Sequence, residues 1–309
     1  MVSASLNLQP LADVSNALAE AVGQLAPAVV AVLANRLGPA SGVLWRPGVV
    51  VTCAHAIRRE DGIRVILADG ARMDAALAGI DASTDLAVLK VEGAGAGVEA
   101  GDQERLRPGH LVFSVARDAS GQAAASFGII AATAGEWRTW RGGRIDRLIR
   151  LDGGLRAGFS GGAVANVAGE VVGIGTAGLT RGYAIVVPAS TVNRVTDTLL
   201  ATGRITRGYL GIGTRPIALP ESLSRKLGLA DPAGLIVLTL APQGPAEAGG
   251  LLLGDILLDL DGQRVRDVAD LYAALPGERI GEPMRLGLIR GGERIESSIM
   301  VGERPRRGC

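Results

Sequence analysis

Strand-length apolar runs separated by turn residues constrain this chain more than any other feature. Glycines punctuate the runs, and 45 glycines in 309 residues are rare in helical bundles. Runs of this kind, bounded by turns, are typical of antiparallel sheets. Because closure removes exposed strand edges, we predict two antiparallel barrels. The predicted strands are 29–33, 49–52, 64–67, 86–91, 111–115, 126–131, 145–151, 162–167, 170–175 and 183–187.

The length of 309 residues suits about two domains of the usual ~100–200 residues. Apolar residues at helical spacing over 11–25 predict an opening helix, and Pro188 begins a second helix that Gly203 ends. A new strand pattern, 235–240, 256–260 and 284–289, starts after Gly208. We therefore predict a helical segment over 1–26, a barrel domain over 27–203, a second domain over 204–302 and a loose tail over 303–309.

Charge and composition argue against several functional classes. A net charge of +1 gives no field that gathers nucleic acid or an anionic membrane. Arginines beside Trp137 and Trp140 favour a solvated basic face over a nucleic-acid surface. The cysteines, Cys53 and Cys309, and the two histidines lack zinc spacing, so we predict no metal and no cofactor.

The first ten residues lack the pattern of a secretory signal, and no stretch reaches the ~20 apolar residues of a membrane span. The chain as written is expected to be soluble and cytoplasmic. A mature export product would have the same appearance, so the compartment stays open.

The run Gly158-Phe159-Ser160-Gly161-Gly162 sets a serine where the backbone must bend tightly. A serine hydroxyl is a weak nucleophile at neutral pH and needs a base, which a third group must orient. In such a turn the amides of Gly158 and Ser160 can converge on a developing oxyanion. A glycine turn between strands is the simpler alternative, and it loses weight once a histidine and an aspartate are found.

His55 and Asp85 are the candidates for base and orienting group. His55 follows a predicted strand, where a side chain can leave a barrel, whereas His110 lies in a turn that looks like surface. Asp85 directly precedes an alternating apolar strand. Its rivals Asp69, Asp74 and Asp81 lie in glycine-bounded turns that look solvated. The order His55, Asp85, Ser160 is one that builds a hydrolytic serine site.

These segments, with Gly42-Val43-Leu44 before them and 170–174 after, resemble the HtrA family of chymotrypsin-fold serine proteases, also called the DegP/DegQ type. The resemblance implies a mainly β chain: a chymotrypsin-like double six-stranded β-barrel followed by a PDZ (α+β) domain. It implies His55 as general base, Asp85 as its orienter and Ser160 as nucleophile, with the amides of Gly158 and Ser160 lining the oxyanion hole.

The chain departs from the family's usual pattern at two positions of this turn. Ala157 stands where the family usually has proline, and Phe159 where it usually has asparagine. Without proline the turn is less preorganised, and the bulk of Phe159 could prop the loop open, close it or occupy the substrate channel. We therefore hypothesise a loop that depends on activation. The family also implies a homotrimer, but no aromatic residue precedes Trp45 to support one.

The substrate pocket is predicted to take small or medium aliphatic side chains. Basic-specific relatives of the fold carry an acid six residues before the serine, where this chain has Gly154. The strand containing Ile174 and Gly175 is expected to form a wall.

Tyr209-Leu210-Gly211-Ile212 opens the second unit with an apolar-Gly-apolar turn, which can point amides at a peptide carboxylate while the next strand edge pairs with the peptide. Together with 242–246, 254–257 and a helix over 268–275, it is similar to the PDZ domain of HtrA-type proteases. The resemblance implies peptide binding or regulation at Leu210, Gly211 and Ile212. A structural module with a filled groove is the alternative.

Taken together, the residues and the resemblance predict a serine endopeptidase that degrades unfolded or damaged proteins, in protein quality control and the stress response. A catalytically weak chaperone or peptide-binding scaffold is the alternative. An esterase of the α/β-hydrolase type would need a histidine after the serine, and none follows Ser160.

Overall fold

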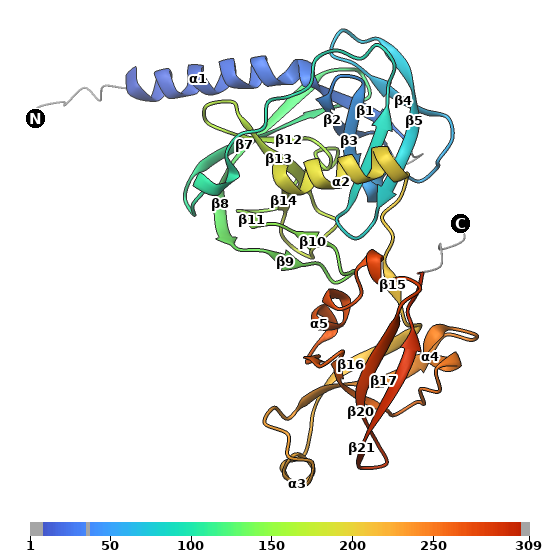
Figure 1. Ribbon diagram of the computed structural model, residues 1–309. Coiled ribbons are helices and arrows are strands. Elements are labelled where there is room, and N and C mark those ends of the chain that lie inside the picture. Colours follow the sequence, from blue (N-terminus) through green and yellow to red (C-terminus); the bar gives the residue numbers. More distant parts are fainter. Residues whose placement is uncertain (1–8, 35–37, 304–309) are drawn as a thin grey trace, which may run out of the picture. The chain divides into compact units, whose positions relative to one another are not determined.

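A computed structural model describes residues 9–34 and 38–303 and divides the chain into two compact units, with the boundary between Arg204 and Ile205. Figure 1 shows the strand-rich first unit and the smaller second unit, each with its own sheets. Within the described residues no helix is long and apolar enough to span a membrane. The first eight residues and most of the predicted tail, 304–309, lie outside the described residues, and so do the predictions made for them.

The first barrel closes in the order β1-β2-β3-β6-β5-β4. Its interior is filled by aliphatic side chains, among them Val30, Val50, Ile63 and Leu89, which are at most 1% exposed. The strands are β1 (Val29–Leu33), β2 (Ala40–Arg46), β3 (Val49–Cys53), β4 (Ile63–Ile66), β5 (Arg72–Asp81) and β6 (Leu86–Lys90). All neighbouring strands of this barrel pair antiparallel. Because the sheet is closed, it leaves no free edge.

The second barrel closes in the order β11-β14-β13-β12-β7-β8 around a core that includes Ile130, Ile149, Val164 and Val172. Its strands are β7 (Leu111–Arg117), β8 (Ala123–Ala134), β11 (Leu148–Leu151), β12 (Ala163–Asn166), β13 (Val171–Thr176) and β14 (Ile185–Pro188). A separate pair, β9 (Trp137–Arg138) and β10 (Arg144–Ile145), interrupts the run predicted as one strand over 145–151. Two closed six-stranded barrels confirm the predicted fold class.

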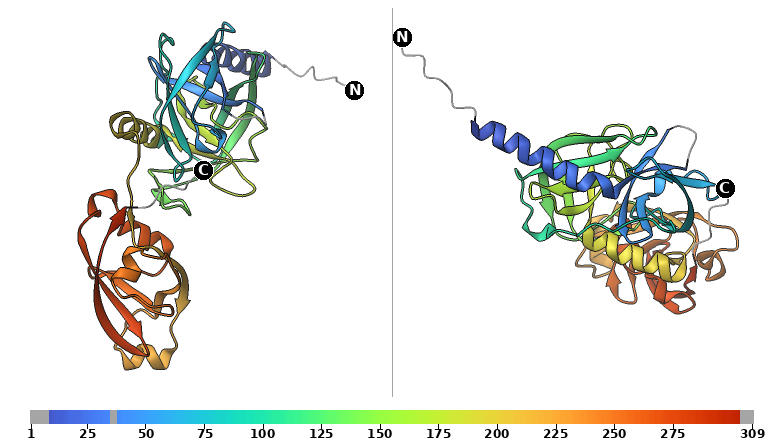
Figure 2. Two further views of the ribbon diagram at one scale, coloured as in Figure 1. Left: turned by 90° about the vertical axis from the view of Figure 1, so that its right-hand side faces the viewer. Right: turned by 90° about the horizontal axis from the view of Figure 1, so that it is seen from above.

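Two longer helices belong to the first unit. α1 (Gln9–Leu25) projects from the barrels (Figure 2) and buries only Ala21 and Leu25, while Leu11 and Val14 near its start are exposed. α2 (Ala189–Thr202) starts after Pro188 and ends at Gly203, whose φ of 72° gives the left-handed C-cap expected of glycine. Short 3₁₀ turns are η1 (Ala26–Ala28), η2 (Ala54–Ala56) and η3 (Gln103–Arg105).

The second unit is an open sheet in the order β16-β17-β18-β20-β21, with β19 paired to β18. Its core contains Leu210, Leu235, Leu257 and Leu286. The strands are β15 (Gly208–Tyr209), β16 (Ile212–Ala218), β17 (Ala233–Leu240), β18 (Ile256–Leu260), β19 (Gln263–Arg264), β20 (Pro283–Arg290), β21 (Glu293–Met300) and β22 (Gly302–Glu303). The helices are α3 (Glu221–Lys226), α4 (Pro245–Ala248), α5 (Val268–Ala273) and η4 (Gly277–Arg279).

Two sequence expectations are corrected by the fold. Glu303, assigned to the loose tail, is the last residue of β22 and pairs with Gly208. Asp81, which looked solvated, ends β5 and is only 4% exposed. Gly79 and the glycine before β5, Gly70, make this part of the sequence look like turns rather than strand.

Candidate active site

His55 and Asp85 lie in direct contact in the first unit. β3 delivers His55 onto the turn η2, where its side chain is 39% exposed, while Asp85 precedes β6 and is buried. The distance from His55 Nδ1 to Asp85 Oδ2 is 2.7 Å. The other carboxylate oxygen, Oδ1, accepts from the His55 backbone amide at 2.9 Å. A carboxylate held this way favours the imidazole tautomer with a proton on Nδ1, which leaves Nε2 free to accept one.

The turn before Asp85 fixes the position of its carboxylate. Asp85 has a φ of 58°, an uncommon conformation for a residue other than glycine. Asp81 stabilises this turn by accepting from the Ser83 amide at 3.0 Å, from the Ser83 hydroxyl and from Thr84 Oγ1 at 2.8 Å. From the second barrel, Thr176 Oγ1 donates to Asp85 Oδ2 at 2.5 Å. Both barrels therefore hold the carboxylate that orients His55.

Cys53, at the end of β3, lies beside this pair, and its sulfur is within 4.8 Å of a ligand atom on both His55 and Asp85. Burial, and then the negative charge of Asp85, raise the pKa of the Cys53 thiol well above its usual value. A thiol must lose its proton to bind a metal. The donor set is therefore poorly suited to a cation, and Cys53 fits the buried apolar role predicted for it.

The two residues after Ser160, Gly161 and Gly162, have no room for a side chain. Gly161 has a φ of 86°, and a Cβ there would meet the Ser41 carbonyl oxygen at 2.1 Å. A Cβ on Gly162 would meet the Val115 carbonyl oxygen at 2.4 Å. The two glycines after the serine are therefore required by close approach of the backbone to β2 and β7, not only by the bend.

The residues before Ser160 form a type II turn. The Phe159 amide donates to the Arg156 carbonyl at 3.0 Å. Gly158 has a φ of 85°, whereas the φ of Ala157 is not positive. A turn with positive φ only at its third residue is type II. Within residues 9–34 and 38–303, the amides of Gly158 and Ser160 donate to no protein acceptor. The structure therefore shows this turn already formed.

The serine turn (residues 158–160) is linked through the next residue, Gly161, to β13, the strand whose Thr176 donates to Asp85. The Gly161 amide donates to the Gly175 carbonyl at 2.9 Å, and Gly175 directly precedes Thr176, the donor to Asp85. Among the described side chains, Ser160 and His55 form no hydrogen bond with each other. Such contacts are often long in proteins without bound substrate and tighten in the complex.

Phe159 is buried, with 7% of its surface exposed. Its side chain therefore packs inside the domain and does not stand in an open substrate channel, one of the three roles considered for it. Burial of this large aromatic side chain anchors the last residue of the type II turn.

The predicted pocket residues differ in what they can contact. Gly154 is exposed and has open space around it, while Ile174 is fully buried in β13 and presents no surface to a ligand. Leu155 takes the place nearest Gly175: a Cβ on Gly175 would lie 3.1 Å from Leu155 Cδ1. The sequence gave no periodic signal for Leu155, because it lies in an irregular segment.

His110 is exposed, in agreement with its prediction as a surface residue. The arginines of the basic segment are largely paired. Arg147 contacts Glu104 at 2.5 Å, Arg144 contacts Glu136 at 3.2 Å, and Arg141 lies 4.5 Å above the Trp140 ring.

In the second unit, the loop from Leu210 to Ile212 leads into β16, the edge strand of the sheet. The carbonyls of Leu210 and Gly211 accept inside the unit, from Ala246 and Ala241, each at 2.7 Å. The amides of Leu210 and Gly211 donate to no residue in the described part of the chain. β16, which Ile212 begins, pairs with β17 alone among the described strands, so its outer edge is free to accept another strand.

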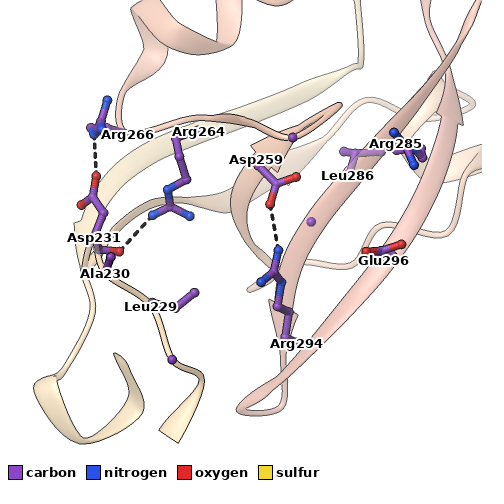
Figure 3. A pocket seen from close by; sticks show the side chains of 13 residues that line it. Leu229, Ala230, Asp231, Asp259, Arg264, Arg266, Arg285, Leu286, Arg294 and Glu296 are labelled. Atoms are coloured by element: carbon purple, nitrogen blue, oxygen red, sulfur yellow. Dashed lines mark hydrogen bonds and ion pairs between the residues drawn. The ribbon is translucent and has the colours of Figure 1, made fainter. Parts of the chain in front are cut away.

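A separate cavity of about 570 Å³ lies against β18, β20 and β21, and none of its lining residues belongs to this loop. Figure 3 shows two ion pairs among the charged residues that line it. Arg266 contacts Asp231 at 2.5 Å and Arg294 contacts Asp259 at 3.4 Å, while Arg264 donates to the Asp231 carbonyl at 3.0 Å. The cavity is therefore distinct from the loop at 210–212.

Comparisons with known proteins agree with this architecture. Residues 40–174 match the trypsin-like peptidase domain and residues 208–301 match the PDZ domain. A probable periplasmic serine endoprotease DegP-like of Pseudomonas putida (strain GB-1) is 34% identical over 269 residues, which is 85% of this chain and 55% of that protein. The DegP-like protein of Brucella suis biovar 1 is 32% identical over 85% of this chain and 52% of its own length.

Solved structures give the same result. The HtrA-type protease AlgW with a tripeptide is 30% identical with a TM-score of 0.73, covering 94% of this chain and 98% of that one. The serine endoprotease from Yersinia pestis is 28% identical, also with a TM-score of 0.73, covering 93% and 98%. Fold and sequence thus define a trypsin-like peptidase domain joined to a PDZ domain.

The chain belongs to the HtrA-type serine proteases. It spans about half the length of the curated DegP-like relatives it matches.

Proposed function

We propose that this protein is a serine endopeptidase of unfolded or damaged proteins, with Ser160 as nucleophile, His55 as general base and Asp85 as the group that orients it. The observation that carries the proposal is the 2.7 Å contact between His55 Nδ1 and Asp85 Oδ2, beside a serine turn with two unengaged amides. A scaffold that only binds peptides has no need of this arrangement.

In the acylation step Ser160 Oγ attacks the carbonyl carbon of the scissile peptide bond, and His55 Nε2 takes the hydroxyl proton. Asp85 stabilises the imidazolium through Nδ1–H. The negative oxygen of the tetrahedral intermediate accepts from the amides of Gly158 and Ser160. His55 then gives the proton to the leaving amine as the C–N bond breaks.

Deacylation repeats the sequence with water. His55 takes a proton from water, whose oxygen attacks the acyl carbon, and the second intermediate occupies the same pair of amides. Ser160 leaves with the proton that His55 returns. Hydrolysis releases the carboxyl product and restores the enzyme.

For the residue before the scissile bond we propose an aliphatic side chain of small or medium size. Gly154 offers no charge to a basic side chain, and Leu155 packs close to Gly175, where it would give an apolar contact. A peptide panel with varied residues at this position measures the preference. Cleavage mainly after Arg or Lys would reject it.

For the second unit we propose binding of peptide C-termini, with the carboxylate at the Leu210 and Gly211 amides and the peptide added as a strand along β16. Free amides and a free strand edge support this. AlgW structures with a tripeptide and with a decapeptide support peptide binding in related proteins.

Labelling with a fluorophosphonate tests the enzyme proposal. The purified chain is expected to take up one label at Ser160, located by mass spectrometry, and Ser160→Ala is expected to take up none. A wild-type chain that stays unlabelled even with unfolded protein present would favour the peptide-binding scaffold instead.

A further inference from the structure

Ser41, in β2 of the first barrel, contacts the serine turn of the second barrel on both sides of Phe159. Its Oγ donates to the Gly158 carbonyl at 2.7 Å, and its backbone amide donates to the Ser160 carbonyl at 3.2 Å. Ser41 is fully buried. Thr52 Oγ1, three residues before His55, donates to the Ser41 carbonyl at 2.6 Å. Ser41 thus links the strand that leads to His55 with the turn that carries Ser160.

These bonds fix three consecutive peptide groups of the turn. The 158–159 group is held by Ser41 Oγ at its carbonyl and by Arg156 at its amide. The 160–161 group is held by Ser41 N at its carbonyl and by Gly175 at its amide. The group between them is held by Gly162, whose amide donates to the Phe159 carbonyl at 3.0 Å. Because the neighbouring groups are fixed, the amides of Gly158 and Ser160 have little freedom to rotate.

The Ser41 hydroxyl is itself oriented. It accepts from the Arg117 backbone amide at 3.0 Å, which leaves its proton directed at Gly158. The Arg117 side chain anchors this end of β7, because its guanidinium donates to the carbonyls of Val29, Gly121 and Ala26, each at 2.5 Å. The hydroxyl therefore accepts a hydrogen bond from β7 and donates one to the turn.

We propose that Ser41 is a positioning residue for the oxyanion site: its hydroxyl holds the Gly158 carbonyl so that the Gly158 amide stays available to the intermediate. This role rests on the proposed endopeptidase function. Nothing in the sequence pattern separates Ser41 from the other serines, because the contact joins residues 117 positions apart.

The test is Ser41→Ala in the full chain. We expect kcat on a peptide substrate to fall by about ten- to a hundredfold, less than the ~10²–10³-fold of losing a whole oxyanion donor. KM is expected to stay within roughly twofold, because the contact acts on the transition state and not on ground-state binding. Ser114→Ala removes another buried serine hydroxyl, from β7, and is the matched control with unchanged kcat. Melting temperatures of both variants check folding.

Crystal structures of Ser160→Ala with and without Ser41→Ala give a second readout that needs no activity. We expect the type II turn to be lost or to change its φ at Gly158 when Ser41 is replaced. If the wild type cleaves the peptide and Ser41→Ala has the same kcat, the positioning role is overturned and the proposed function stays intact. An inactive wild type overturns the proposed function. Ser41 is then judged on the crystal structures, where an unchanged turn overturns its role.

Discussion

The serine turn at 158–160 and the loop at 210–212 use the same backbone device in different surroundings. In each, a glycine with φ near 80° leaves two amides without a protein acceptor among the described residues. The serine turn lies among groups that can move a proton, since Thr176 links it to Asp85 and His55. The loop lies beside the free edge of β16 and has no titratable side chain within its three residues.

A pair of free amides can bind an anionic oxygen in either place, but the surrounding groups determine the lifetime of the bound anion. Next to a nucleophile and a base, the anion is an intermediate that forms and collapses. Next to a strand edge, the proposed anion is the permanent carboxylate of a bound peptide. Three substitutions test the roles of the two amide pairs separately, and a fourth tests the stability of the second unit.

Ser160→Ala has the largest expected effect. Without the hydroxyl no acyl-enzyme forms, and kcat should fall by about 10⁶-fold, as for other nucleophiles of this type. Affinity of the second unit for a C-terminal peptide, measured by calorimetry on the full chain, should stay within about twofold. A parallel loss of peptide affinity would show that the two amide pairs do not act independently.

Asp85→Asn comes next. The amide keeps the shape but disfavours the tautomer that His55 needs, and the expected loss in kcat is about 10⁴-fold. The rate of fluorophosphonate labelling should fall with it. Asp74→Asn, at an exposed rival position, is the control and should leave the rate unchanged. Equal rates for Asp85→Asn and wild type would remove Asp85 from the site.

Gly211→Val affects the other amide pair. Gly211 has a φ of 80°, and a Cβ there would lie 3.3 Å from the Ala241 Cβ. A β-branched side chain should therefore twist the loop and weaken C-terminal peptide binding by about ten- to a hundredfold, the scale of hydrogen bonds to a charged group. Hydrolysis of a short peptide should not change.

Gly228→Val is the matched control, because Gly228 also has positive φ, 63°, but open space around it. It carries similar backbone strain without touching the loop. If both variants lose peptide binding equally, the effect comes from general destabilisation and the binding role of the loop is rejected.

Asp255→Asn has the smallest expected effect and concerns stability. Burial acts to raise the pKa of Asp255, but hydrogen bonds and charge from Arg290 and the Leu252 amide lower it overall. A lowered pKa in the folded state contributes stability that is present above the unfolded pKa of about 3.9 and is lost as pH falls through the folded pKa. Asp255→Asn should cost the second unit about 1–2 kcal/mol at pH 7.

Calorimetry at pH 7 and pH 3 measures this difference. The variant and wild type should unfold at more similar temperatures at pH 3, because this pH lies below the unfolded pKa of about 3.9, so the unfolded wild type binds a proton there and part of the stabilisation is lost. A gap that widens on acidification would contradict the assignment. Peptide hydrolysis at pH 7 serves as the control for the first unit and should be unchanged.

Sequence reasoning found the residues that follow local rules. Apolar alternation located β1 and β18 at their observed bounds, and Gly203 was identified as a helix end from its position after the last apolar turn. His55 and Asp85 stand out because each adjoins such a strand, and the structure brings them into contact. Ser160 stands out because it lies within the glycine run 158–162.

What sequence reasoning missed depends on contacts between distant segments. Thr176 donates to a carboxylate 91 positions away, and Ser41 bonds the serine turn from the other barrel. Ile174 was expected at a pocket wall, but its position on β13 turns it into the core. Asp81 looks solvated in the sequence because a glycine-bounded turn is expected there, but it is buried and its carboxylate accepts from Ser83 and Thr84.

A crystal structure of the full chain with an aliphatic peptide boronic acid tests the central claim most directly. We expect a covalent bond from Ser160 Oγ to boron and one boronate oxygen within about 3 Å of both the Gly158 and Ser160 amides, the distance of a hydrogen bond. A boronate bound elsewhere, or one whose oxygens avoid both amides while Ser160 stays unmodified, would contradict the account.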